Sequence, residues 1–218
     1  MLEMLHLQGC LVTLDAMGCQ KAIVAKIVEK KADYLVSVKD NQPTLRAIAE
    51  EEVAWVGREG VERVGGSYAQ EVEKRAGEEI VREAWVVPAP LDLEDLAPWV
   101  GLKSVVWARR RVKKEGKEEV GQRWFITSLA PDQAARVLRA IREHWAIENQ
   151  LHWCLDVAFH EDQQRTHARY AAENMARLRH IALNLLKKET SAKAGLATKR
   201  HMAGWNHDYL FKVLALPS

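Results

Sequence analysis

Two imidazoles and a carboxylate recur at four-residue spacing in the stretch HWAIENQLHWCLDVAFHEDQQR, residues 144–165. If this stretch forms one helix, His144, Glu148 and His152 lie on the same face. A different face then carries an apolar stripe of Ile147, Leu151, Cys154 and Ala158. A carboxylate beside aromatic side chains is costly to bury unless a cation or hydrogen bonds satisfy it. Glu148 is therefore a candidate metal ligand or acid–base group, although the spacing also suits a surface pair of His144 and Glu148.

A second candidate carboxylate follows a short apolar run, CLVTLD at residues 10–15, which is typical of a buried strand in a mostly parallel sheet. Asp15 would lie at the C-terminal end of that strand, where open α/β sheets place ligands and catalytic groups. A helical pattern follows within residues 16–33, then a second strand at 34–39 and a helix at about 44–56. This order predicts a βαβ unit with a right-handed crossover, and hence an α/β fold.

The character of the chain changes after Gly57, and residues 58–128 are predicted to be mostly antiparallel strands. Residues 71–87 contain two strands with a turn near Ala76 and Gly77, and a second hairpin joins 104–112 to 120–128 through KKEGKE. From Pro131 onward the pattern is helical. The expected helices cover about 132–142, 144–165, 168–189 and the segment WNHDYLFKVLAL at 205–216.

Composition narrows the classes of protein. Hydrophobic residues make up 48% of the chain, which favours a globular protein. The sequence contains no run of roughly 18 apolar residues, so no membrane span is predicted. The three cysteines, Cys10, Cys19 and Cys154, form no CxxC pair and suit reduced thiols in the cytoplasm. The net charge is only +2, so any argument for nucleic-acid binding must be local.

The stretch HWAIENQLHWCLDVAFHED resembles the Glu-bearing helix of bacterial insertion-sequence DDE transposases, in the group that includes the H-repeat-associated proteins. Other segments resemble the same family: VTLDAMGCQ at 12–20, DYLVSVKDNQPTL at 33–45, RWFITSL at 123–129 and LRHIALNLLKK at 178–188. The resemblance implies an RNase H-like α/β fold that is incomplete at its N-terminus. It implies a partial core at 1–57, a β-rich insertion at 58–128, helices completing the core at 129–190 and a tail at 191–218.

The resemblance also implies a chemistry. Asp15 takes the place of the second acidic residue of the catalytic triad, and Glu148 takes the place of the third. These carboxylates would bind Mg²⁺ or Mn²⁺ for phosphodiester cleavage and DNA strand transfer, and hard oxygen ligands suit both ions. Two such ions about 4 Å apart can activate the nucleophile and stabilise the leaving oxygen. The implied partners are double-stranded DNA of the element ends and target, and a second copy in a homodimer.

The sequence departs from the family pattern at functional positions. Only 14 residues precede Asp15, and they include Glu3 but no strand that bears an aspartate, so the first acidic residue is expected to be absent. Ala76-Gly77-Glu78 stands where the family has a His-Gly-Arg motif. Leu155 stands where related transposases have a basic residue. These departures predict an inactive C-terminal fragment of a transposase.

Contacts to DNA should be electrostatic first. The candidate contacts are Lys39 and Asn41 after the second strand, Arg109, Arg110, Arg111 and Lys113 on the second hairpin, and Arg165 and Arg169 after the Glu148 stretch. The same residues can instead be solvated faces balanced by acidic neighbours, and Asn41 can instead cap the next helix.

Two hypotheses from other classes remain open from the sequence. The chain can be a catalytically dead DNA-binding protein that acts through its charged surface alone. It can also be a zinc-stabilised interaction module, with ligands drawn from His144, His152, Cys154 and His160, although their spacing matches no standard zinc motif.

Overall fold

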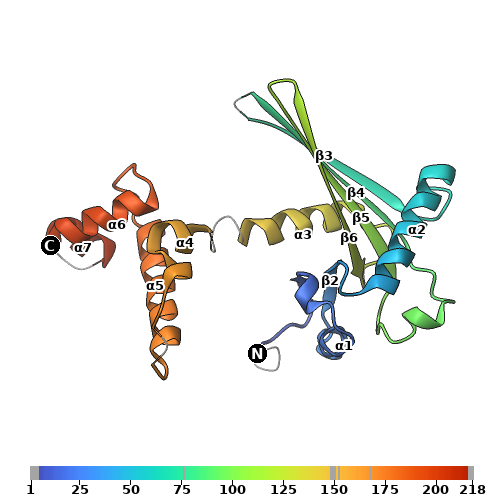
Figure 1. Ribbon diagram of the computed structural model, residues 1–218, viewed down its shortest axis with the longest axis horizontal. Coiled ribbons are helices and arrows are strands. Elements are labelled where there is room, and N and C mark those ends of the chain that lie inside the picture. The colour runs from blue at the N-terminus through green and yellow to red at the C-terminus, as the bar shows by residue number, and fades with distance from the viewer. Residues whose placement is uncertain (1–4, 76, 148–150, 152, 167, 216–218) are drawn as a thin grey trace. The chain divides into compact units, whose positions relative to one another are not determined.

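The computed structural model describes residues 5–75, 77–147, 151, 153–166 and 168–215 (Figure 1). The chain forms two compact units, residues 1–144 and 145–218. Each unit has its own hydrophobic core. The finer division at residues 57, 128 and 190 stays a prediction.

The first unit is built on a six-stranded sheet with the strand order β1-β2-β6-β5-β4-β3. Its strands are β1 (Leu11–Leu14), β2 (Asp33–Val38), β3 (Ser67–Arg75), β4 (Glu78–Pro88), β5 (Ser104–Lys114) and β6 (Lys117–Thr127). The pair β1 and β2 is parallel, and the other pairs in this sheet are antiparallel. The mixed α/β class is confirmed. The strands expected in an insertion continue the sheet of the βαβ unit, because β6 pairs directly with β2.

Helices pack on both faces of this sheet because strand residues alternate between the faces. On one face α1 (Lys21–Glu29) and α2 (Pro43–Glu59) pack against strand residues that include Val36 and Ile126. On the other face α3 (Ala134–Ile147) packs against strand residues that include Leu35 and Phe125. Strand β2 is therefore apolar on both sides, as its continuous hydrophobic run predicts.

The hairpins β3–β4 and β5–β6 extend beyond the part of the sheet that the helices cover (Figure 1). The second hairpin is longer than its sequence pattern indicates, since β5 reaches Lys114 and β6 begins at Lys117. Its turn has only two central residues, Glu115 with φ 49° and Gly116 with φ 77°. Positive φ at both positions is typical of the tight turns that match the twist of a hairpin. The KKEGKE segment is thus mostly strand rather than loop.

The second unit contains four α-helices within its described residues: α4 (Trp153–Phe159), α5 (Ala171–Lys188), α6 (Leu196–Trp205) and α7 (His207–Val213). Its core joins Leu155 of α4 to Leu183 of α5, and Leu186 of α5 to Tyr209 and Val213 of α7. The long helix expected at 168–189 is confirmed as α5. No helix of the described residues is long and apolar enough to cross a membrane.

The boundaries around residue 144 differ from the expectation. A single helix, α3, runs from Ala134 to Ile147, so the separate helices expected at 132–142 and 144–165 share one element. The expected continuous helix to residue 165 is wrong at its far end, because α4 ends at Phe159. The next residue, His160, has φ 54°, a left-handed backbone conformation that stops an α-helix. Glu148 and His152 lie outside the described residues.

Two glycines allow an opposed test of this packing. A Cβ on Gly66 would meet Val86 O at 2.5 Å and Val87 Cγ1 at 2.9 Å, whereas a Cβ on Gly57 in α2 has no atom within 4 Å. We expect Gly66→Ala to lower the free energy of unfolding by about 1–3 kcal/mol through overpacking. Gly57→Ala should raise it by about 0.5–1 kcal/mol through helix propensity. Urea unfolding of both variants measures whether each change raises or lowers the free energy of unfolding. Equal changes in the two variants would contradict the packing described at Gly66.

Candidate functional site

Asp15 follows the last residue of β1 and precedes a short 3-10 turn at Ala16–Gly18. Its side chain is 55% exposed, and its Oδ1 lies 3.5 Å from Lys39 Nζ. A hydrogen bond from the backbone of Ala16 lowers the pKa of Asp15, burial opposes this, and the Lys39 and His144 side chains lower it further. The net pKa lies below its ordinary value, so Asp15 is an ionised carboxylate at the expected end of the strand.

The loop after β2 is tied to the turn after β1. Asn41 Nδ2 donates to Ala16 O at 2.8 Å, and Gln42 Nε2 donates to Cys19 O at 2.9 Å. These bonds join the C-terminal ends of the two parallel strands, where Asp15 and Lys39 lie. Asn41, a candidate DNA contact from the sequence, therefore uses its amide N–H to hold the loop that carries Asp15.

The end of α3 reaches β1 through His144. Thr13 Oγ1 and His144 Nδ1 are 3.0 Å apart, and the two side chains form a hydrogen bond whose donor depends on the imidazole tautomer. Thr13 lies two residues after Leu11 on β1, so both side chains lie on the face of the sheet that α3 covers. His144 thus contributes to the electrostatic environment of Asp15.

Arg123 is a member of this site that the sequence reasoning missed. It lies on β6, two residues before Phe125, so both residues lie on the face of the sheet that α3 covers. Arg123 is half-buried. Burial lowers the pKa of Arg123, and the charge of Asp15 opposes that effect. The signal was the alternation in RWFITSL, which puts an arginine on the same face as the buried Phe125 and Thr127.

The meeting of Asp15 with Glu148 stays a prediction, because Glu148 lies outside the described residues. Of the proposed zinc ligands, His152 is also outside them, Cys154 is buried in the core of the second unit, and His144 bonds to Thr13 in the first. Among the residues that the structure describes, no group of three or more His, Cys, Asp or Glu is placed to hold a metal ion.

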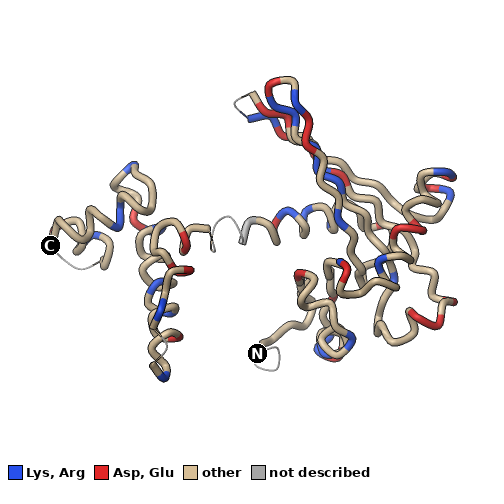
Figure 2. Tube along the Cα trace, in the orientation of Figure 1, with Lys and Arg blue, Asp and Glu red and all other residues tan. Residues whose placement is uncertain are grey.

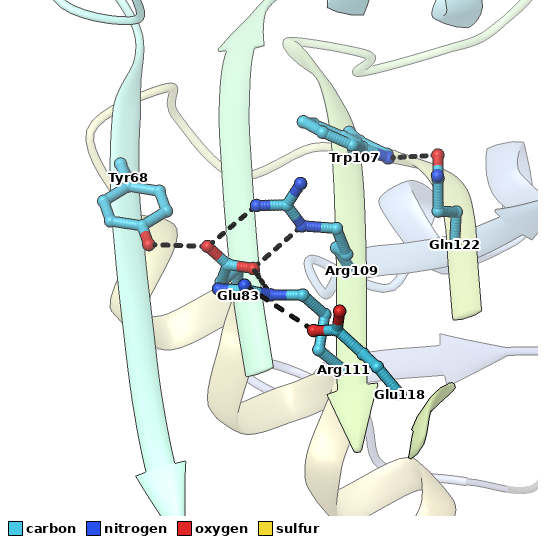
Figure 3. A network of polar contacts seen from close by, with 7 residues as sticks. All are labelled: Tyr68, Glu83, Trp107, Arg109, Arg111, Glu118 and Gln122. Carbon is cyan, nitrogen blue, oxygen red and sulfur yellow. Dashed lines mark hydrogen bonds and ion pairs between the residues drawn. The ribbon is translucent and has the colours of Figure 1, made fainter. Parts of the chain in front are cut away.

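Two of the candidate DNA-contacting arginines are paired with a buried acid (Figure 3). Glu83 on β4 is only 4% exposed and accepts hydrogen bonds from Arg109 Nε at 2.8 Å and Arg111 Nε at 3.3 Å. Tyr68 Oη also donates to Glu83, at 3.0 Å. The guanidinium of Arg109 lies over the stacked rings of Trp85 and Trp107. This network engages Nε and Nη2 of Arg109 and Nε of Arg111.

Positive and negative side chains are mixed along the outer parts of the hairpins (Figure 2). Lys114 Nζ lies 2.6 Å from Glu78 Oε1, and Lys74 Nζ lies 3.4 Å from Glu79 Oε2. The candidates Arg110 and Lys113 are exposed, and Lys113 stands opposite both Glu79 and Glu118 in the strand register. The outer parts of the hairpins therefore carry balanced charges, which favours a solvated surface over a uniformly basic DNA-binding face.

The candidates Arg165 and Arg169 belong to the second unit. Both are exposed, and Arg169 has a left-handed backbone with φ 46°. Two other arginines of this unit make ion pairs: Arg177 with Glu173, and Arg179 with Glu161.

Comparison with known proteins relates the whole chain to transposases. A family model described as a transposase DDE domain matches residues 1–185. Over 220 residues the chain is 40% identical to the putative protein YbfL and 39% identical to the H repeat-associated putative transposase YhhI, both of Escherichia coli K12. It is 40% identical over 222 residues to the putative transposase YncI of Escherichia coli O157:H7. Each match covers 99% of this chain but only 55–57% of the relative, so the chain spans little more than half the length of these curated relatives. The family resemblance identified from the sequence is confirmed.

Proposed function

This chain belongs to the family of transposases with a DDE domain, and from that premise we propose that it contributes Asp15 and Glu148 to a metal-dependent DNA strand-transfer site. The observation that carries the proposal is the ionised Asp15 carboxylate at the C-terminal end of a parallel strand. In this proposal the sheet and α3 belong to an RNase H-like core. The six-stranded α/β sheet supports that fold assignment.

The chemistry of Asp15 fits a divalent ion. A carboxylate oxygen is the hard ligand that Mg²⁺ and Mn²⁺ prefer. The partner of Asp15 is a loose one, because Lys39 and Asp15 are 53% and 55% exposed and their closest atoms are 3.5 Å apart. Such an exposed pair contributes about 0–1 kcal/mol, so a metal ion can replace Lys39 at little cost.

Each side chain then has a defined task. Asp15 and Glu148 hold the metal, which, when bound, supplies activation of the attacking oxygen and stabilisation of the leaving oxygen. Thr13 fixes the ring of His144 beside Asp15, and Asn41 holds the turn that follows Asp15. The proposed substrate is the double-stranded DNA of an insertion element and its target.

The proposal places the first acidic residue of the triad on a strand beside β1. In the described sheet β1 is an edge strand that pairs with β2 alone. An edge strand offers a row of backbone N–H and C=O groups to a further strand. A carboxylate at the end of such a strand would lie next to Asp15. Residues 5–14 contain no Asp or Glu and do not supply this carboxylate.

Metal titration tests the proposal directly. We expect Mn²⁺ to bind the full chain weakly and Asp15→Asn and Glu148→Gln each to reduce its affinity at least tenfold, which corresponds to about 1.4 kcal/mol. Asp40→Asn is the matched control, because Asp40 is 99% exposed and pairs with Arg46 at 3.7 Å. Electron paramagnetic resonance of free Mn²⁺ measures the binding. If Asp15→Asn and Asp40→Asn behave alike, the proposed metal site is wrong.

A further inference from the structure

Lys39 follows β2 and Arg123 lies on β6, the two strands that come after β1 in the order of the sheet, so both lie on the same side of Asp15. In the antiparallel register of β2 and β6, Val38 stands opposite Trp124. Lys39, which follows Val38, and Arg123, which precedes Trp124, therefore come together at one end of the sheet. Lys39 Nζ is 3.5 Å from Asp15 Oδ1, and Arg123 interacts electrostatically with the same carboxylate. Two cations, one after β2 and one on β6, thus lie near one strand-end acid.

The position of Arg123 is unusual for an arginine. Its neighbours along the same face of β6 are Phe125 and Thr127, which are both buried. Partial burial of a guanidinium costs free energy unless hydrogen bonds and charges compensate it. A guanidinium has five N–H donors in a planar fork, so one arginine can bind more than one acceptor. Such a fork suits a carboxylate on one edge and a phosphate on another.

We propose that Arg123 and Lys39 together hold a phosphate of the DNA backbone at the C-terminal end of β1, independently of any metal ion. This inference rests on the proposed function, because it takes the DNA substrate of that site as the ligand. It moves the expected phosphate contact away from Arg109 and Arg111, which hydrogen-bond to Glu83, and toward the site of Asp15. Lys39 supplies a point charge on a flexible stem, and Arg123 supplies donors in a planar fork.

Duplex binding in EDTA isolates this contact from metal chemistry. We expect Arg123→Gln and Lys39→Gln each to weaken binding of a short duplex roughly three- to tenfold at low salt and to reduce the salt slope by about one. Arg123→Lys should recover part of the loss, because it restores the charge without the fork. The control is Arg63→Gln, which changes an exposed arginine in the turn after α2 and should leave affinity unchanged. Fluorescence anisotropy of a labelled duplex gives both affinity and slope.

A second readout separates phosphate contact from a structural role. Removing a cation beside Asp15 should raise Mn²⁺ affinity roughly two- to fivefold, since the ion no longer competes with that charge. Weaker DNA binding together with tighter Mn²⁺ binding supports the proposal, whereas loss of both would indicate a misfolded site and overturn it. Wild-type duplex affinity in Arg123→Gln would also overturn it. If Asp15→Asn leaves Mn²⁺ binding unchanged, the metal site fails while the EDTA result for Arg123 still stands.

Discussion

Glu83→Gln is expected to lower the free energy of unfolding by about 2–4 kcal/mol. Removing one partner of a fully buried ion pair costs about 3–5 kcal/mol, because the other charge is left uncompensated. Glu83 is 4% exposed, but Arg109 and Arg111 are 29% and 36% exposed and keep part of their hydration. The expected loss is therefore set below the fully buried range. Urea unfolding of the full chain, followed by tryptophan fluorescence, measures it.

A control and a double-mutant cycle locate the effect. Glu118 pairs with Arg111 at 4.0 Å but is 45% exposed, so Glu118→Gln should change stability by less than about 0.5 kcal/mol. Combining Glu83→Gln with Arg109→Gln should cost less than the sum of the single changes, because Arg109 is the main partner of Glu83. Strict additivity would show that the pair in Figure 3 is not coupled.

The cost of Glu83→Gln should also depend on pH. Burial raises the pKa of Glu83, but hydrogen bonds from Arg109 and Tyr68 and the two guanidinium charges outweigh it, so the pKa lies below its ordinary 4.5. A depressed folded-state pKa adds stability that is present above 4.5 and is lost as the pH falls through the folded value. The difference between wild type and Glu83→Gln should therefore shrink in acid.

The sequence predicted those parts of the site that depend on local pattern. The apolar run before Asp15 and the second run at residues 34–39 placed two strands, and their parallel pairing brings Lys39 to Asp15. Hairpin turns were also predictable, because Gly77 and Gly116 occupy positions with positive φ. The spacing of α5 predicted a helix of nearly the right length.

The rest depended on register and on single backbone angles. The sequence makes Arg109 a candidate DNA contact, because alternation along one strand does not reveal that Glu83 stands opposite it. Arg123 was overlooked for the same reason, since its nearness to Asp15 requires the order β1-β2-β6. The helix end at Phe159 depends on a φ of 54° at His160. Histidine rarely adopts such an angle, and no sequence pattern predicts it.

The C-terminal unit contains a buried polar cluster that joins three helices. Lys199 on α6 is 8% exposed, and its Nζ donates to Leu186 O at 3.4 Å and to Glu189 O at the end of α5. Glu189 in turn accepts hydrogen bonds from Ser191 N at 2.6 Å and from Tyr209 Oη at 2.7 Å. Lys199 therefore satisfies terminal carbonyls of α5 and lies 3.8 Å from the Glu189 carboxylate.

Lys199→Met is expected to destabilise this unit by about 1.5–3 kcal/mol, because it removes charged hydrogen bonds while it keeps the length of the side chain. Lys193→Met makes the same change at an exposed position and should stay within about 0.5 kcal/mol of wild type. Amide hydrogen exchange of α5 to α7 measures the loss in this unit. Equal protection in the two variants would mean that Lys199 does not cap α5.

The same cluster should limit the stability of the C-terminal unit at both acid and alkaline pH. Hydrogen bonds from Ser191 and Tyr209 lower the pKa of Glu189 to about 2, so its contribution is present above the ordinary 4.5 and is lost as the pH falls toward 2. Burial and the bond to Glu189 raise the pKa of Tyr209 to about 12, so its contribution is present below 10 and is lost as the pH rises toward 12. Tyr209→Phe should remove the alkaline loss and weaken the acid one. Circular dichroism across both ranges measures this, and an unchanged alkaline profile would contradict the bond between Tyr209 and Glu189.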